Sequence, residues 1–433
     1  MEERKYIPFT EEMRKDYTIL VPNMLPRHFK IFLKIFEDYG YKMELLETSG
    51  HRIIETGLKY VHNDTCYPAI LVIGQFIDAL NSGKYDPHKT ALILFQTGGG
   101  CRASNYIFLL RKALERAGYG YIPVISLNLA GLENHPGFKL TLPMLHRLFY
   151  GIIYGDMLLS LVNQCKPYEK NKGQTEQLAD ELTALLANKM QTEGISFKKV
   201  KQNCKMILSR FAEIPRVNEE KVKVGVVGEI YVKYSPLGNN NLEQFLIDEG
   251  AEVVVPGLLD FFMYCIVSNI SDIELYGLHK IRKPVLNFVF NYLQKQQNEI
   301  IELMKTDGNF TPPTPIAHTM DLIKDFMGFG TKMGEGWLLT AEMLELNDEG
   351  VHNIVCTQPF GCLPNHICGK GMMKPLKEKK PDMNIVAIDY DSGASKVNQE
   401  NRIKLMLANA RADLAEKNRE NNIKTEEKAY AEA

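Results

Sequence analysis

The chain has 433 residues, 45% hydrophobic and 24% charged, with a formal net charge of −2. This composition is typical of a folded protein of two or three domains, and the lack of a basic surplus argues against nucleic-acid binding. No apolar run reaches the roughly 18 residues that a membrane-spanning helix needs. Residues 1–5 also lack the apolar stretch of a secretory signal. We therefore expect a cytoplasmic protein that binds neither nucleic acid nor membrane.

The first part of the chain alternates between strand and helix patterns. Strand patterns occur at residues 17–22, 42–46, 91–95 and 123–127, and helix patterns at 28–39, 68–80 and 105–117. Strands that alternate with helices predict a parallel sheet. Residues 140–211 then follow a helical pattern with only short breaks.

The alternation then restarts. Strand patterns occur at residues 223–228, 251–256, 353–356 and 384–388, and helix patterns at 241–248, 261–304 and 398–416. The charged, alanine-rich end is expected to be solvated or frayed. We predict an α/β fold with two Rossmann-like parallel-sheet lobes and a helical insert. The predicted domains are residues 1–139 for the first lobe, 140–215 for the helical region, 216–410 for the second lobe and 411–433 for a charged tail.

Several of the eight cysteines follow predicted strands. Cys101 comes after strand 91–95 and three glycines, Cys356 ends a predicted strand, and Cys362 lies in the loop beyond it. In an open α/β sheet, ligands bind at the carboxyl ends of the strands. Disulfides are rare in a reducing compartment, so these thiols are better interpreted as ligands, catalysts or buried side chains. Our interpretation is an iron–sulfur cluster.

Cys66 directly precedes a predicted helix that has Pro68 in its first turn. A thiol at a helix N-terminus has a lowered pKa, which favours metal ligation. We favour ligation for Cys66, Cys101 and Cys362, and leave Cys356 open between a ligand and a small core residue. Cys165 and Cys204 are interpreted as ordinary thiols and Cys265 as a core residue. Cys368, close to Cys362, is left open between a ligand and an ordinary thiol, and its position favours the latter.

Polar and glycine residues beside these thiols are candidate cofactor contacts. Gly99 and Gly100 allow the backbone to approach a bulky inorganic core. Gln96 and Gln358 follow strands in the two lobes and are placed to donate to a cluster or a substrate.

Three further residues are predicted to take part in catalysis. Arg102 follows Cys101 and can offset the charge of a cluster or substrate, with a surface arginine as the alternative. His366, near Cys362, can move a proton, with an idle turn histidine as the alternative. Glu229 follows a strand end and is an acid–base candidate. No Gly-x-x-x-x-Gly-Lys-Ser/Thr or Gly-x-Gly-x-x-Gly motif occurs, so ATP or NAD binding is not indicated.

Six segments of the chain resemble the 2-hydroxyacyl-CoA dehydratase family, which is related to benzoyl-CoA reductase and to double-cubane cluster proteins. The segments are NDTCYPA (63–69), QTGGGCRASNY (96–106), PVISLNLAGLE (123–133), GEIYVKYSPLGNNN (228–241), GEGW (334–337) and QPFGCLPNHICGKG (358–371). The resemblance implies a cluster in the cleft between the lobes, held by cysteines of both. The first two family ligands match Cys66 and Cys101. Cys356 and Cys362 compete as the third, and we prefer Cys362.

The resemblance also implies a cofactor and partners. The cofactor is a 4Fe–4S cluster with one open iron, or an 8Fe–9S double-cubane cluster to which Cys356 and Cys368 add thiols. Such proteins accept low-potential electrons from an ATP-dependent activator iron–sulfur protein and pass them to a small-molecule or acyl-CoA substrate. We expect a dehydratase or reductase component that forms a homodimer. A non-catalytic electron carrier, a double-cubane reductase of small molecules and a cluster-free ligand-binding protein are the alternatives.

Overall fold

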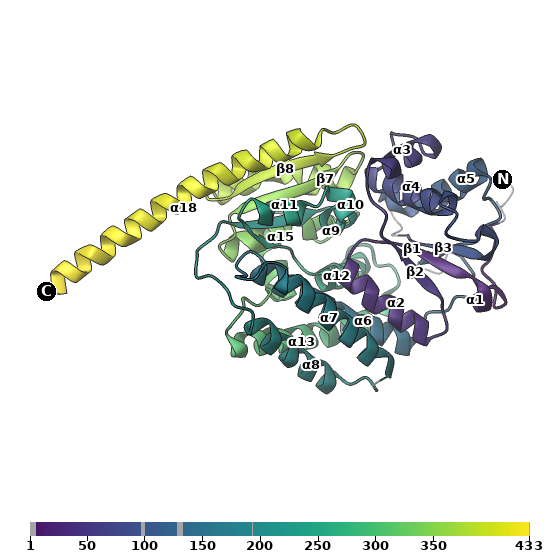
Figure 1. The fold of residues 1–433 in the computed structure, drawn as a ribbon, viewed down its shortest axis with the longest axis horizontal. Helices are drawn as coiled ribbons and strands as arrows, with labels where there is room; N and C mark the ends of the chain where they lie inside the picture. The colour runs from purple at the N-terminus through teal and green to yellow at the C-terminus, as the bar shows by residue number, and fades with distance from the viewer. Residues whose placement is uncertain (1–5, 97–99, 128–132, 193, 433) are drawn as a thin grey trace.

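The computed structural model describes residues 6–96, 100–127, 133–192 and 194–432. Within these residues, eight strands form two four-stranded sheets in which all neighbouring strands are parallel (Figure 1). The orders are β2-β1-β3-β4 and β6-β5-β7-β8. The predicted α/β class with two parallel sheets is therefore confirmed. The strands are β1 (Thr18–Pro22), β2 (Met43–Leu46), β3 (Thr90–Phe95), β4 (Val124–Leu127), β5 (Lys223–Gly228), β6 (Glu252–Val254), β7 (Asn353–Pro359) and β8 (Asn384–Tyr390).

The first sheet is accompanied by helices α1 to α5. Their bounds are α1 (Met13–Asp16), α2 (Pro26–Asp38), α3 (His51–Tyr60), α4 (Tyr67–Asn81) and α5 (Tyr106–Ala117), with short 3₁₀ turns η1 (Pro87–Lys89) and η2 (Arg102–Asn105). Helix α4 is buried along nearly its whole length. It crosses α3 closely, because a Cβ on Gly74 would lie 2.1 Å from the carbonyl oxygen of Ile53 and one on Gly57 2.2 Å from that of Ile70. This packing fixes the start of α4, where Cys66 lies.

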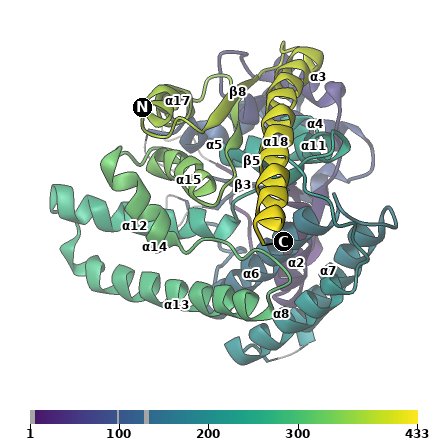
Figure 2. The ribbon, with the colours of Figure 1, turned by 90° about the vertical axis from the view of Figure 1, so that its left-hand side faces the viewer.

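A helical body lies beside the sheets (Figure 2). It contains α6 (Leu142–Cys165), α7 (Gln174–Thr192), α8 (Phe197–Ala212), α12 (Leu258–Tyr276), α13 (Lys283–Asp307) and α14 (Ile316–Leu322), with 3₁₀ turns η3 (Lys280–Arg282) and η4 (Ile323–Asp325). Helices α12 and α13, which we assigned to the second lobe, pack against α6 and α8 respectively. Asp156 of α6 joins them by accepting from the backbone N–H of Leu258 (2.8 Å) and Leu259 (2.9 Å) at the start of α12.

The second sheet is accompanied by short helices and two longer ones. They are α9 (Ile230–Tyr234), α10 (Pro236–Asn239), α11 (Leu242–Asp248), α15 (Gly336–Asp348), α16 (Leu363–Cys368), α17 (Met373–Lys379) and α18 (Lys396–Glu432), with the 3₁₀ turn η5 (Lys370–Met372). Within the described part of the chain, no helix has the length and apolar character needed to cross a bilayer.

Three predicted element boundaries were wrong. The helix expected over 261–304 is two helices, because Gly277 ends α12 in the left-handed region at φ +69°. Strand β7 does not end at Cys356 but continues to Pro359. The helix predicted over 398–416 extends as α18 from Lys396 to Glu432, so the end expected to be solvated or frayed is helical. It projects from the rest of the chain (Figure 1), and its many alanine, glutamate and lysine residues favour helix.

Gly228, the last residue of β5, gives a test of this packing. It has φ +142°, and a Cβ there would lie 2.1 Å from Oγ1 and 2.2 Å from the carbonyl oxygen of Thr357 in β7. We predict that Gly228→Ala lowers the free energy of unfolding by about 3 kcal/mol, through backbone strain and overpacking together. The control is Gly250→Ala, at φ +80° with nothing within 4 Å of the new Cβ, which should cost only about 1 kcal/mol. Equal losses in urea denaturation would contradict the predicted clash.

Candidate functional site

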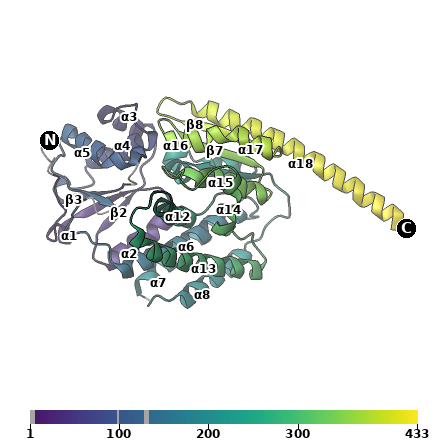
Figure 3. The same ribbon diagram turned by 180° about the vertical axis from the view of Figure 1, so that it is seen from behind.

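The carboxyl ends of the central strands of the two sheets lie against each other. After β1, the carbonyl oxygen of Asn23 accepts from Ser235 Oγ (3.4 Å), beyond the end of β5. The backbone N–H of Tyr67 donates to the carbonyl oxygen of Phe360 (3.1 Å), just after β7. Figure 3 shows the corresponding helices α4 and α16 next to each other. In both sheets the strand order reverses between these central strands, the position where open α/β sheets bind ligands.

Cys66 and Cys362 meet at this junction. Each is the residue just before a helix, Cys66 for α4 and Cys362 for α16, and both are buried. Their side chains are hydrogen-bonded to each other. Gly361, at φ +77°, allows the approach, because a Cβ on it would lie only 3.3 Å from Cα of Cys66. The structure therefore brings together one thiol from each half of the chain.

The hydrogen bond gives the two thiols different acidities. The Cys362 thiol donates to Cys66 and so lowers the pKa of Cys66, and the Tyr106 hydroxyl and the Arg102 charge lower it further. The same hydrogen bond, followed by burial and the charge of Glu335, raises the pKa of Cys362. The Cys66 thiolate is thus the favoured anion of the pair, and a thiolate is the form that binds metal.

Cys101 lies close to the same group of residues. It is half-buried and precedes η2, and the N–H and Oγ of Ser104 both donate to its carbonyl oxygen (3.2 and 2.6 Å). Its charge contributes to the raised pKa of Tyr106, which is due first to burial and then to Cys66 and Glu229. Cys101 and Cys66 therefore both act on the same tyrosine, Tyr106, which places Cys101 near the Cys66–Cys362 pair.

The loop that carries Cys101 is held from both sides. Gln96 donates through Nε2 to the carbonyl oxygen of Ser104 (2.7 Å) and accepts at Oε1 from Ser126 (2.8 Å), so its amide shapes the loop. The N–H of Gly100 donates to Sδ of Met333 (3.0 Å), which comes from the other half of the chain. Gly99, predicted to contact a cofactor, lies outside the described residues.

Two carboxyl groups lie next to the thiols. Glu229 caps α9 by accepting from the N–H of Val232 (2.9 Å), and Glu335 accepts from the N–H of Ile230 (3.0 Å). Burial, then repulsion from Glu335 and Cys66, raise the pKa of Glu229; burial is also the main cause of the raised pKa of Glu335. Two neighbouring carboxyls in a poorly solvated site favour retention of a proton.

Glu335 is a site residue that our sequence analysis did not assign, although it lies in the GEGW segment. Gly334 at φ +60° and Gly336 at φ +46° flank it, and a Cβ on Gly336 would lie 2.2 Å from the carbonyl oxygen of Thr331. This backbone conformation, available to glycine, directs Glu335 toward the N-terminus of α9. A charged residue between two glycines was the available signal.

The other two predicted catalytic residues are placed differently. Arg102 Nη1 donates to the carbonyl oxygen of Asp64 (2.6 Å), and the Arg102 charge acts on Cys66. His366 is exposed on α16, with Nδ1 2.7 Å from the carbonyl oxygen of Cys362. Arg102 is therefore part of the thiol group, while His366 is on the outer side of the turn.

Cys356 and Cys368 have surroundings different from those of Cys362. Cys356 is buried inside β7, 3.8 Å from Oδ1 of Asn365, and burial raises its pKa to about 12. Burial raises the pKa of Cys368, at the end of α16, to about 11. Gln358, on the same face of β7 as Cys356, is fully buried, and neither end of its amide has a hydrogen-bond partner among the described residues. Nδ2 of Asn365 is also unpaired within that set.

The donor atoms near the thiols suit some metal centres better than others. Among the described residues, no three His, Cys, Asp or Glu side chains gather closely enough to hold a single metal ion. An iron–sulfur cluster sets different demands, because its inorganic core separates the thiolates that bind it. Cys66, Cys362 and the neighbouring Cys101 fit such a group by their chemistry, and binding would replace the Cys66–Cys362 hydrogen bond.

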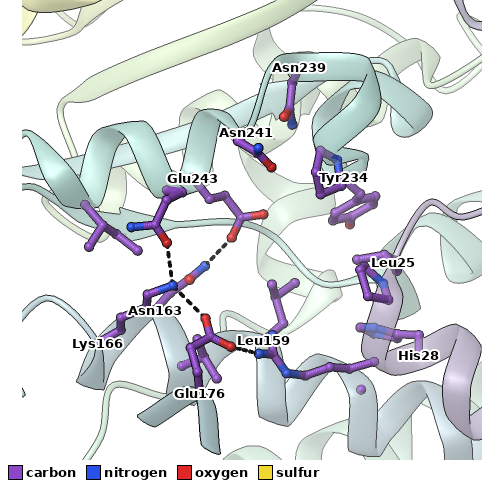
Figure 4. A pocket seen from close by; sticks show the side chains of 17 residues that line it. Leu25, His28, Leu159, Asn163, Lys166, Glu176, Tyr234, Asn239, Asn241 and Glu243 are labelled. Carbon is purple, nitrogen blue, oxygen red and sulfur yellow. Dashed lines mark hydrogen bonds and ion pairs between the residues drawn. The ribbon is translucent and has the colours of Figure 1, made fainter. Parts of the chain in front are cut away.

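A separate pocket of about 180 Å³ lies between α2, α6, α7 and α11 (Figure 4). Glu243 accepts there from Asn163 Nδ2 (2.9 Å), and Lys166 pairs with Glu176 (2.6 Å). Asn239 also lines the pocket, but its amide donates to the carbonyl oxygens of Val232 and Lys233 (2.9 and 3.1 Å). None of the pocket's lining residues is a cysteine, so this pocket is distinct from the thiol site.

No protein-family model matches the chain, and no curated protein matches it significantly.

The thiol contact predicts a specific disulfide. In the cluster-free chain, diamide should oxidise the Cys66 and Cys362 thiols to one disulfide, with both hydrogens transferred to the diamide. Mass spectrometry of a non-reducing digest should find the peptides of residues 66 and 362 joined, and Cys362→Ser should abolish the link. Cys204, whose pKa burial raises to about 12, should stay reduced. A Cys101–Cys362 or Cys101–Cys66 disulfide as the main product would contradict the geometry.

The raised pKa of Glu335 predicts a pH dependence of stability. Because the folded state holds this proton more tightly than the unfolded state, whose carboxyl has a pKa near 4.5, the free energy of unfolding should fall as the pH rises above that value. Glu335→Gln in the cluster-free chain should therefore be more stable, relative to the unmodified chain, at pH 8 than at pH 4. Urea denaturation across this range measures the difference. Glu302→Gln, at a side chain 68% exposed, is the control, and a pH-independent effect of Glu335→Gln would refute the assignment.

Proposed function

We propose that the chain is an iron–sulfur protein that resembles 2-hydroxyacyl-CoA dehydratase components. In this proposal two Rossmann-like lobes enclose a cleft, and Cys66, Cys101 and Cys362 hold a cluster in it. The protein takes low-potential electrons from an ATP-dependent activator protein and passes them to a small-molecule or acyl-CoA substrate. The observation that carries the proposal is the hydrogen-bonded contact between Cys66 and Cys362, which come from opposite halves of the chain.

The positions of the cysteines support Cys362 over Cys356 as the third ligand. Cys362 lies beyond the end of β7 and precedes α16, in the position that Cys66 has before α4. Cys356 lies within β7, and Asn365 and Gly369 contact it. A ligand inside a central strand would require the sheet to open, whereas ligands in loops at the strand ends require only local movement.

The cluster would supply one-electron chemistry, and the chain would supply the environment. The Tyr106 hydroxyl and the Arg102 guanidinium stabilise negative charge on the Cys66 sulfur. The raised pKa values of Glu229 and Glu335, due first to burial, favour the protonated forms of two carboxyls beside the thiols.

A double-cubane cluster is the second candidate. The unpaired amide of Gln358 and the unpaired Nδ2 of Asn365 lie in the segment that contains Cys356 and Cys368. Buried polar atoms without partners are costly, and a larger cluster with its sulfides would give them a partner. This candidate places Cys356 and Cys368 among the ligands.

Anaerobic purification with iron and sulfide analysis tests the proposal. We predict about four irons per chain for a single cubane and about eight for a double cubane. Cys66→Ala, Cys101→Ala and Cys362→Ala should each lose most of the iron, while Cys165→Ala, the control at a buried helical thiol, should keep it. Loss of iron in Cys356→Ala as well selects the double cubane.

An iron content near zero, or one unaffected by all three changes, would refute cluster binding at this site. If the iron content supports cluster binding, an assay for turnover of an acyl-CoA with an activator and ATP distinguishes a catalytic component from an electron carrier.

A further inference from the structure

The helix pair α12 and α13 carries a large apolar surface that the rest of the described chain leaves uncovered. It extends from the C-terminal end of α12 through η3 and along the first turns of α13, and reaches the start of α6. We call it the α12–α13 apolar face. Its exposed side chains are Leu142, Leu145, Leu275, Tyr276, Leu278, Ile281, Val285, Phe288, Val289 and Tyr292.

The face is a continuous stripe. Ile281, Val285, Phe288 and Tyr292 are spaced by three or four residues, which places them on one side of the helix. Tyr292 is fixed to α6 by its hydroxyl, 2.8 Å from Nε2 of His146. Leu142 precedes His146 by four residues and therefore extends the same stripe onto α6.

The opposite end of the face adjoins the thiol site. A Cβ on Gly330 would lie 2.9 Å from Cδ1 of Leu275, so the loop after α14 packs against the end of α12. Met333, three residues further along this loop, accepts from the N–H of Gly100 (3.0 Å). The face and the loop that carries Cys101 are thus connected through one short segment.

The exposed area is too large for an ordinary monomer surface. Ile281 is 92% exposed, Phe288 72% and Val285 63%. Since a fully exposed aromatic side chain offers roughly 150–250 Å² and aliphatic side chains somewhat less, the whole face presents on the order of 1,000 Å². The largest apolar patch of a typical monomer is about 300–600 Å², and a stable interface needs about 800 Å² from each partner.

We propose that the α12–α13 apolar face joins two copies of this chain in a two-fold symmetric dimer. A two-fold contact places the same patch on both sides, and a stripe of aromatic and branched side chains can interdigitate with its own copy as ridges with grooves. From Ile281 to Tyr292 the stripe is about 16 Å long at 1.5 Å per residue. The contact would therefore run along the side of the helix and not only at its end.

The charges around the face are only partly paired. Lys283 pairs with Glu274 (2.8 Å), and Lys332 pairs with Asp272, both within the chain, whereas Lys280 and Arg282 of η3 form no ion pair among the described residues. The choice of a second copy therefore rests on the apolar area, which matches what each partner of a stable dimer contributes. The proposal does not depend on whether the cysteines hold a cluster.

Sedimentation velocity of the full chain tests the dimer. At about 10 µM the expected mass is twice 49.3 kDa. The double variant Ile281→Asp/Phe288→Asp should weaken association by at least about 100-fold, because it places two charges at the centre of the interface. Leu405→Asp is the matched control, at a side chain 66% exposed on α18, which lies on the opposite side of the molecule from α13 (Figure 1).

Photo-crosslinking from benzoylphenylalanine at Val285 provides a second measurement that does not depend on destabilising the dimer. Crosslinked peptides should come from residues 275–292 of the second copy. A monomer at 10 µM, a dimer that survives the double variant, or crosslinks that map elsewhere would each overturn the proposal. So would a monomer that binds anionic phosphatidylserine vesicles through this face.

Discussion

The arrangement of the site depends on one contact, the hydrogen bond between the Cys66 and Cys362 thiols. Each thiol precedes a helix that begins at the carboxyl edge of a parallel sheet, and the two edges face each other. The contact requires the glycine at position 361, since a larger residue would meet both Cys66 and the Arg102 guanidinium. The two halves of the chain therefore meet where both sheets have their ligand-binding edge.

The surroundings of this contact shift the pKa values of the Cys66 thiol and of the nearby carboxyls in opposite directions. Tyr106 and Arg102 favour the Cys66 thiolate, while Glu229 and Glu335 have raised pKa values that favour their neutral forms. The pKa shifts thus favour negative charge on the Cys66 sulfur and neutral carboxyls in the same buried region. Such a division suits a site that receives electrons, because added negative charge can be balanced locally by protons.

The sequence predicted the sheets better than the helices. Strand runs such as 91–95 and 224–227 are short and carry no polar side chain, so they identify buried parallel strands. The long apolar pattern over 261–304 hid a break, because a single glycine at 277 ends α12 without any change in hydrophobicity. The C-terminal helix was underestimated, because composition alone does not show how far helix-forming residues extend a helix.

At the site, cysteines at strand ends could be recognised because their position in an α/β pattern has a known geometric meaning. Tyr106 could not, because its proximity to Cys66 depends on how α5 packs, and Glu335 had only the two flanking glycines as a signal, which does not indicate its proximity to Cys66. Gln96 was read as a cofactor contact from its position after β3, but its amide is used by Ser104 and Ser126. Gln358, predicted to follow the matching strand of the second sheet, lies inside β7 and has an unpaired amide. The same sequence pattern therefore corresponds to two different environments.

The central claim is that sulfurs from two sheets share one inorganic centre. Mössbauer spectroscopy of the chain loaded anaerobically with ⁵⁷Fe tests it most directly. The account predicts the spectrum of a sulfur-coordinated cluster that accepts one electron from dithionite or a stronger reductant. A spectrum of isolated iron ions, or no iron retained after desalting, would contradict it.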